Sequence, residues 1–284
     1  MRRLALSLIL TLTATAAFAH DFHMTRRGDD CSSSNFHWDG EKAFVEKQVI
    51  DAGALRSLKA SVSHAPISVT GGNGRGYTIE VCKAAARQAD LAAIRVSVDG
   101  GELRADGPDG SRWLVIYNIK APRGAHIDVS ATNGPLSIKD VDGTVVARTS
   151  NGPLSLRNVS GDVDATTTNG PLSVQGGSGN LKVSASNGPL SVGLEGNSWV
   201  GGTLDASTRN GPLSLTLPRG YNSGVVVETN GRGPVACRAE GCERFRAERD
   251  VRDWHDQPRR IELGNGPENV RLSTVNGPVT IKDE

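Results

Sequence analysis

One short phrase, Asn-Gly-Pro-Leu-Ser followed by Ile, Leu or Val, occurs five times between residues 133 and 215. The first four copies begin 18 residues apart, and a second glycine lies midway between neighbouring copies. Self-similarity at a fixed period is typical of stacked repeat architectures. The five copies begin at Asn133, Asn151, Asn169, Asn187 and Asn210, and looser relatives begin at Asn230 and Asn276. We expect these asparagines to form a ladder of turn residues.

Between the glycines, small or apolar residues alternate with polar ones, which is the two-residue period of a β-strand. In the unit that ends at Asn169, the positions expected to face inward are Val163, Ala165 and Thr167. The alternation resumes after the turn, where Leu172 is expected to point inward and Ser173 outward. Each 18-residue unit is therefore expected to contain two short strands and two glycine turns.

Antiparallel hairpins would not place identical residues of successive units side by side, whereas a chain that climbs about 4.8 Å per turn would do so. We therefore predict an all-β fold, a single-stranded parallel β-solenoid with 18 residues in each regular coil. Right-handed crossovers between parallel strands are strongly favoured, so we expect right-handed winding. Stacked asparagine side chains could also hydrogen-bond from coil to coil.

The chain begins with the features of a secretory signal peptide over residues 1–19, namely two arginines, an apolar run and Ala17-Phe18-Ala19 before the cleavage point. Export to the periplasm, the cell surface or the medium is therefore expected. Residues 20–42 are polar, and we expect an irregular arm. Residues 43–284 are predicted to form the solenoid domain, with imperfect coils at 43–118, the most regular coils at 125–216 and a charged loop excursion at 237–259. A short helix is expected between Cys82 and Ala93.

Four cysteines in an exported protein indicate two disulfides, for which three pairings are possible. We favour Cys237 with Cys242, which closes a short loop, and Cys31 with Cys82, which joins the arm to an early coil. A zinc half-site at Cys237 and Cys242 is the alternative, although the sequence offers no evident second half. We assign no metal and no cofactor to the chain.

Three aspartates occupy the same outward position, five residues before the turn asparagine, and are Asp128, Asp164 and Asp205. The intervening coils carry Val146 and Lys182 at this position. Some parallel β-helices cleave polysaccharides with charged residues on one face, so this interrupted column is a candidate sugar or calcium site. The simpler interpretation is a set of solvated charges.

Two tryptophans lie in irregular polar segments and are the remaining candidates for ligand binding. An exposed ring of Trp38 or Trp254 could stack on a sugar. The alternative is that each ring covers the end of a hydrophobic core, which is the more common role of an isolated tryptophan.

Several of these features together resemble a known bacterial family of exported β-strand-repeat proteins, which are provisionally named adhesins and have no known function. They are the export signal, the segment Val115-Ile-Tyr-Asn-Ile-Lys-Ala-Pro-Arg-Gly124, the repeated strand-Asn-Gly-strand units and the closing Gly264-Asn-Gly-Pro-Glu-Asn-Val-Arg-Leu-Ser-Thr-Val-Asn-Gly-Pro-Val279. The resemblance covers residues 43–284. It implies a single-stranded parallel β-helix at the cell envelope and no catalytic residues. The proline after Asn-Gly and the cysteine loop depart from the family pattern.

The charge balance is nearly even, with 32 basic and 31 acidic residues, and no basic stripe with stacking aromatics is evident, which argues against a nucleic-acid partner. No apolar stretch after the signal peptide is long enough to cross a membrane. We expect a non-catalytic solenoid that serves as a cell-envelope scaffold or adhesin-like binding surface, with an envelope component, a surface protein or a glycan as its partner. The alternative is a polysaccharide-binding or polysaccharide-cleaving β-helix protein.

Overall fold

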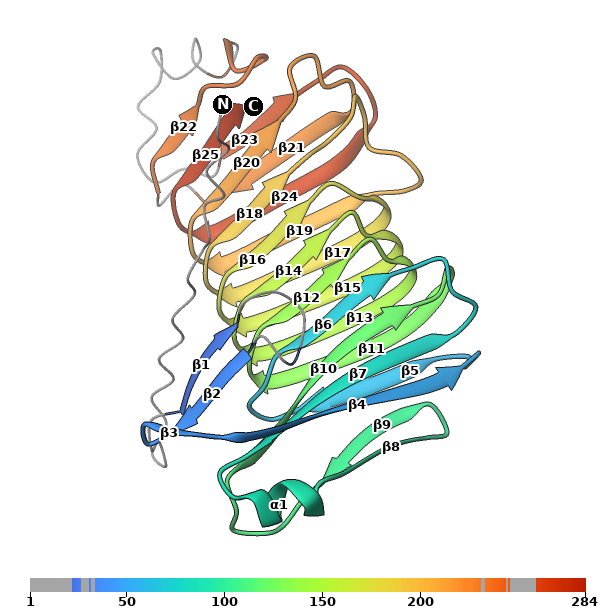
Figure 1. Cartoon of the computed structure of the whole chain (residues 1–284). Helices are drawn as coiled ribbons and strands as arrows, with labels where there is room; N and C mark the ends of the chain where they lie inside the picture. The colour runs from blue at the N-terminus through green and yellow to red at the C-terminus, as the bar shows by residue number, and fades with distance from the viewer. Residues whose placement is uncertain (1–21, 27–30, 32–33, 231–232, 244, 246–258) are drawn as a thin grey trace, which may run out of the picture.

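The computed structural model describes residues 22–26, 31, 34–230, 233–243, 245 and 259–284. In this part of the chain the strands form two 11-stranded sheets and one three-stranded sheet, with one short helix, α1 (Gln88–Ala93) (Figure 1). We call the three-stranded sheet sheet A, the sheet that contains β12 sheet B and the sheet that contains β11 sheet C. No helix in the described part is both long and apolar enough to cross a membrane.

The repeated phrase produces a regular alternation between sheets B and C. Sheet C holds the longer strands β11 (Ala125–Asn133), β13 (Asp142–Asn151), β15 (Ser160–Asn169), β17 (Ser178–Asn187) and β19 (Leu204–Asn210). After each Asn-Gly turn the chain enters sheet B as β12 (Leu136–Lys139), β14 (Leu154–Arg157), β16 (Leu172–Gln175), β18 (Leu190–Gly193) and β20 (Leu213–Leu217). We call one passage through both sheets a rung.

Neighbouring rungs pair in parallel and in the register that the repeat predicts. Leu154 lies beside Leu172, and Asn151 lies beside Asn169, so identical residues of successive repeats are adjacent. The core lies between sheets B and C, and the inward positions are closed to solvent: Leu154 and Leu172 are each 1% exposed. The predicted all-β class and the predicted inward positions are both correct for these five rungs.

One further rung precedes the regular ones. β5 (Leu58–Val62) pairs in parallel with β11, and β6 (Ile67–Gly71) pairs in parallel with β12. The turn between β5 and β6 is the degenerate copy of the phrase, with Ala65 in the position of the glycine. The backbone N–H of Asn133 donates to the carbonyl of Ser63 at 2.8 Å, which continues the stack of turns.

The rest of residues 43–118 differs from the predicted coils, because this segment is largely antiparallel. β4 (Phe44–Gly53), β7 (Tyr77–Ala85) and β10 (Trp113–Ala121) are antiparallel neighbours, and β8 (Arg95–Asp99) forms a hairpin with β9 (Glu102–Asp106). The hairpin turn contains Gly100 and Gly101, both at positive φ, and such two-residue turns reverse the chain direction. Helix α1, within the predicted helical stretch, follows β7.

The arm predicted to be irregular contains the strands of sheet A, β1 (Phe22–Arg26), β2 (Ser34–Trp38) and β3 (Glu41–Lys42). Phe36 and Trp38 pack with Leu114 and Ile116 in a second hydrophobic cluster, apart from the main core. The disulfide between Cys31 and Cys82 joins the arm to β7. This part of the arm is ordered because its aromatic side chains bury apolar surface of β7 and β10.

The C-terminal repeat does not occupy the end of the stack. β24 (Glu268–Asn276) and β25 (Val279–Asp283) lie between the β19–β20 rung and the earlier strands β21 (Gly224–Thr229) and β22 (Val235–Cys237). β23 (Arg259–Leu263) is antiparallel to β21 at the edge of sheet C. The second disulfide joins Cys237 and Cys242, as favoured above. Most of the predicted loop excursion, residues 246–258, lies outside the described residues.

Candidate functional site

The three candidate aspartates do stand in one column on the outer face of sheet C, but never on adjacent strands. The register gives the column order Lys59, Asp128, Val146, Asp164, Lys182, Asp205 and Arg271. Strands are about 4.8 Å apart, so aspartates two strands apart are separated by roughly 9–10 Å along the sheet. A Ca²⁺ ion takes oxygen ligands at about 2.3–2.6 Å, so two of these carboxylates cannot bind one ion together.

Opposite charges interrupt the column and balance it locally. Lys182 stands directly between Asp164 and Asp205. Arg148, on the strand next to Asp128, forms an ion pair with it at 3.6 Å, and both side chains are about half exposed. No group of three His, Cys, Asp or Glu residues in the described part of the chain is arranged to hold a metal ion. The column therefore resembles a charge-compensated strip more than a cation site.

Part of the column borders an open depression of about 410 Å³ on sheet C. Its polar lining comes from four consecutive rungs and combines hydroxyl, carboxylate, amide and ammonium groups, with Val146 on the first of these rungs. The Nδ2 of Asn180 donates to Oδ1 of Asp162 at 3.0 Å, which orders two of these groups. The polar lining residues are Thr144, Asp162, Asp164, Asn180, Lys182, Thr203 and Asp205.

Thr144, Asp162 and Asn180 were not among the residues expected at the site. Each lies two residues before a member of the column on the same strand and therefore on the same face of the sheet. The two-residue offset from the aspartate column is therefore the sequence feature that could have identified these three residues as neighbours on the same face. It could not show that the surface is hollowed there, because the shape of a face depends on all neighbouring strands.

Of the two tryptophans considered as ligand-binding residues, only Trp38 lies in the described part of the chain. Trp38 is only 9% exposed and belongs to the cluster between sheet A and sheet B, so its ring is not available to stack on a sugar. The position of Trp38 fits the alternative in which the ring covers part of a hydrophobic core. Trp254 lies outside the described residues.

The turn asparagines form a continuous side-chain ladder along the edge of the stack. In each step the Nδ2 of one asparagine donates to Oδ1 of the asparagine on the preceding rung, over 2.8–3.0 Å. The residues joined in this way are Asn133, Asn151, Asn169, Asn187, Asn210 and Asn276. The backbone supports the ladder, since Gly152 N–H, for example, donates to the carbonyl of Asn169 at 3.0 Å.

Asn230 was expected in the ladder, but the structure places its turn differently. Gly233 lies over Gly277, because a Cβ built on Gly233 would be 2.3 Å from the carbonyl oxygen of Gly277. The stacked glycine therefore follows Asn230 by three residues, whereas Gly277 follows Asn276 directly. Among the described residues, the ladder ends at Asn276.

Buried threonines bind the turns from the inside. Thr167 Oγ1 donates to the carbonyl of Gly152 at 3.2 Å, and Thr149 makes the same contact with Gly134 at 3.1 Å. The inward threonine thus satisfies a turn carbonyl of the preceding rung. In the fourth regular rung this position is Ala185, so the contact is missing there.

The outer face of sheet B carries a different column, made of hydroxyl groups. Ser137, Ser155, Ser173, Ser191 and Ser214 are adjacent in register, with Ser68 at one end and Thr280 at the other. Ser173 Oγ donates to Ser155 Oγ at 3.2 Å. A motif proline precedes each of the five serines by two residues, so a proline column runs beside the hydroxyl column. Both columns repeat at the strand spacing.

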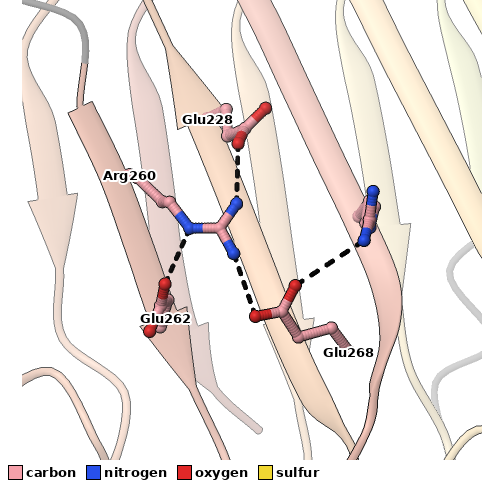
Figure 2. Close-up of polar contacts among 5 residues, drawn as sticks. Glu228, Arg260, Glu262 and Glu268 are labelled. Carbon is pink, nitrogen blue, oxygen red and sulfur yellow. Dashed lines mark hydrogen bonds and ion pairs between the residues drawn. The ribbon is translucent and has the colours of Figure 1, made fainter.

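A cluster of ion pairs lies on sheet C near β24. Figure 2 shows Arg260 in contact with the carboxylates of Glu228, Glu262 and Glu268, at 2.8, 2.7 and 2.9 Å. These carboxylates raise the pKa of the Arg260 guanidinium. The residues come from β21, β23 and β24, so the cluster links strands that are distant in the sequence.

Taken together, the fold and these surfaces define an all-β protein built from stacked parallel rungs with regular polar columns on both outer faces. No protein-family model matches the chain, and no curated protein sequence matches it.

The chain is similar at low identity to solved structures of proteins that are provisionally named for adhesion. One, a cell adhesion protein from Clostridium sporogenes, is 12% identical over 86% of this chain and 100% of its own, with a TM-score of 0.32. Adhesins from Bacteroides fragilis and Parabacteroides merdae are 11% and 10% identical over 85% and 84% of this chain and 97% and 95% of their own, with TM-scores of 0.30 and 0.34. Likenesses at this level carry no weight for fold or function.

Proposed function

We propose that the protein is an exported, non-catalytic, right-handed parallel β-solenoid that serves as a cell-envelope scaffold or adhesin-like binding surface. The observation that carries the proposal is the column of serines on sheet B, in which one side chain recurs on consecutive rungs in strict register. A stack with a closed core and side-chain ladders presents such a column as a rigid, periodic surface. A rigid surface binds without losing much conformational entropy of its own.

Export rests on the signal-peptide features of residues 1–19 and on the two disulfides, since structural disulfides are typical of proteins that fold in oxidising compartments. We propose the periplasm or the cell surface as the site of action. The partner is an envelope component, a surface protein or a glycan, because the hydroxyl column offers hydrogen-bond donors and acceptors and little charge.

The test is a binding measurement on the chain without its signal peptide, with isolated envelope fractions and a glycan array as ligands. A variant with Ser155→Lys, Ser173→Lys and Ser191→Lys is expected to lose binding. The matched control carries Ser150→Lys, Thr168→Lys and Ser186→Lys, which add the same charges to the same rungs on the outer face of sheet C. If binding survives the three sheet B substitutions and is lost with the sheet C control, the assignment of binding to the outer face of sheet B is refuted. Absence of binding to every fraction and glycan would refute the adhesin-like function.

A second candidate function, polysaccharide binding or cleavage, is favoured by the depression on sheet C. Its hydroxyl, carboxylate and amide groups suit hydrogen bonds to sugar hydroxyls, and its three aspartates against one lysine disfavour polyanionic chains. A lyase and hydrolase assay on neutral, amine-bearing and uronic-acid polysaccharides separates the two functions. Turnover that is abolished by Asp164→Ala would replace the scaffold proposal with this one.

A further inference from the structure

The last repeat of the chain is inserted between two earlier parts of it. β24 pairs in parallel with β19 on one side and β21 on the other, and β25 pairs in the same way with β20 and β22 (Figure 1). We call residues 268–283 the inserted rung. β21 and β22 precede this rung in the sequence, yet they lie two strand spacings, about 9–10 Å, from β19 and β20, because the rung lies between them.

The inserted rung continues the regular stack on every contact that defines it. Asn276 Nδ2 donates to Asn210 Oδ1 at 2.8 Å, and Thr274 Oγ1 donates to the carbonyl of Gly211 at 3.1 Å. Its inward side chains, Val270, Leu272, Val279 and Ile281, are at most 1% exposed. The position beside β19 and β20 is therefore fully satisfied by this segment.

The segment β21–β22 is a competitor for the same position. Its inward residues Val225, Val227 and Cys237 follow the same alternation and are also buried. Its turn is two residues longer, however, and the buried hydroxyl of Thr229, the counterpart of Thr274, has no partner in the described part of the chain. The longer turn in the sequence and the unpartnered Thr229 hydroxyl distinguish this segment from the inserted rung, whereas the apolar faces of the two are alike.

We propose that the inserted rung is exchangeable and that a second copy of this chain can supply it, which gives a rung-swapped dimer. The contacts of the rung are backbone pairings on both edges and inward side chains, and these are identical when the rung comes from another copy. The rung joins β23 through residues 264–267, which include Gly264 and Gly266. These four residues are the hinge at which the rung leaves its own molecule.

The Arg260 cluster closes this hinge. Arg260 precedes the hinge on β23, Glu268 follows it as the first residue of β24, and the guanidinium joins the two at 2.9 Å (Figure 2). A further bond to Glu228 holds the same guanidinium to β21. Only the pair with Glu268 spans the hinge. Exposed ion pairs are individually weak, so the loss of this pair should ease the opening of the hinge with little effect on global stability.

The experiment uses two preparations of the full chain, one with Ser207→Cys and the other with Ser273→Cys. Ser207 and Ser273 are register partners on β19 and β24. At about 4.8 Å between adjacent strands they are close enough for a disulfide. The double variant Ser207→Cys/Ser273→Cys verifies the geometry by forming the bond within one chain. After the two single variants are mixed under mild oxidation, a dimer linked from 207 to 273 is expected on a non-reducing gel and by peptide mass mapping.

The matched control is a mixture of Ser184→Cys and Ser207→Cys chains, whose positions are register partners on the interior rungs β17 and β19. Interior rungs have no hinge, so this mixture should give only random crosslinks. Arg260→Ala in both copies should raise the yield of the 207–273 dimer by roughly 2- to 5-fold, the effect of losing the one exposed ion pair, with Glu268, that spans the hinge. Equal yields from test and control mixtures, or a yield unchanged by Arg260→Ala, would overturn the proposal.

Discussion

Replacement of one ladder asparagine measures how far the stack depends on contacts between repeats. Asn169 makes two ladder bonds: its Nδ2 donates to Asn151 Oδ1 at 2.9 Å, and its Oδ1 accepts from Asn187 Nδ2 at 3.0 Å. A net contribution of about 0.5–1.5 kcal/mol per intramolecular hydrogen bond is typical. Because the ladder is exposed, we expect Asn169→Ala to lower the free energy of unfolding by about 1–2 kcal/mol, the lower part of that range for two bonds.

The ladder also contains its own internal comparison. Asn133 accepts a single ladder bond, from Asn151, so Asn133→Ala is expected to cost about half as much as Asn169→Ala. Urea unfolding followed by circular dichroism gives the midpoints, which are compared where the m-values agree. Thr168→Ala, at an exposed outward position next to Asn169, is the control for a change that removes no ladder bond. The reasoning is refuted if Asn169→Ala costs no more than Thr168→Ala, or if Asn133→Ala costs as much as Asn169→Ala.

Three further outcomes are expected. Gly170→Ala would place a Cβ 2.2 Å from the carbonyl oxygen of Gly152, so a loss of about 3 kcal/mol is expected in the same urea assay. Thr167→Val removes the hydroxyl that binds the Gly152 carbonyl and should cost about 1–2 kcal/mol, whereas Thr167→Ser, which keeps the hydroxyl, is the control that should retain this hydrogen bond. Burial raises the pKa of Tyr221 to about 12 from its ordinary 10.0. The raised pKa stabilises the fold below pH 10, and this stability should be lost as the pH rises through 12, a loss that unfolding curves of Tyr221→Phe should lack.

The regular rungs could be predicted because a single physical pattern specifies each of them. The two-residue alternation assigned Val163 and Ala165 to the core, and the 18-residue spacing placed Leu154 beside Leu172, as the pairing confirms. Both features are local in the sequence and repeat without change. Because five units carry the same pattern, a wrong inward or outward assignment in one unit would conflict with the other four.

The candidate site was less predictable. The equivalence of the Asp128 and Asp164 positions follows from the repeat, yet the neighbours Val146 and Lys182 decide what the column can bind. An outward residue is defined by its own strand, whereas a binding site is defined by several strands at once. The burial of Trp38 was open for the same reason, since it depends on the outer face of β7 and β10.

By itself, the sequence determined the strand class, the length of a rung, the inward and outward faces and the asparagine turns, because each depends on residues within one repeat. Tertiary structure decided the antiparallel start, the cover formed by sheet A and the insertion of β24–β25 between β19–β20 and β21–β22. In each of these cases more than one segment has an apolar face that could cover the core. The free energy of the alternative pairings decides between them, and in this chain the final repeat lies between β19–β20 and β21–β22.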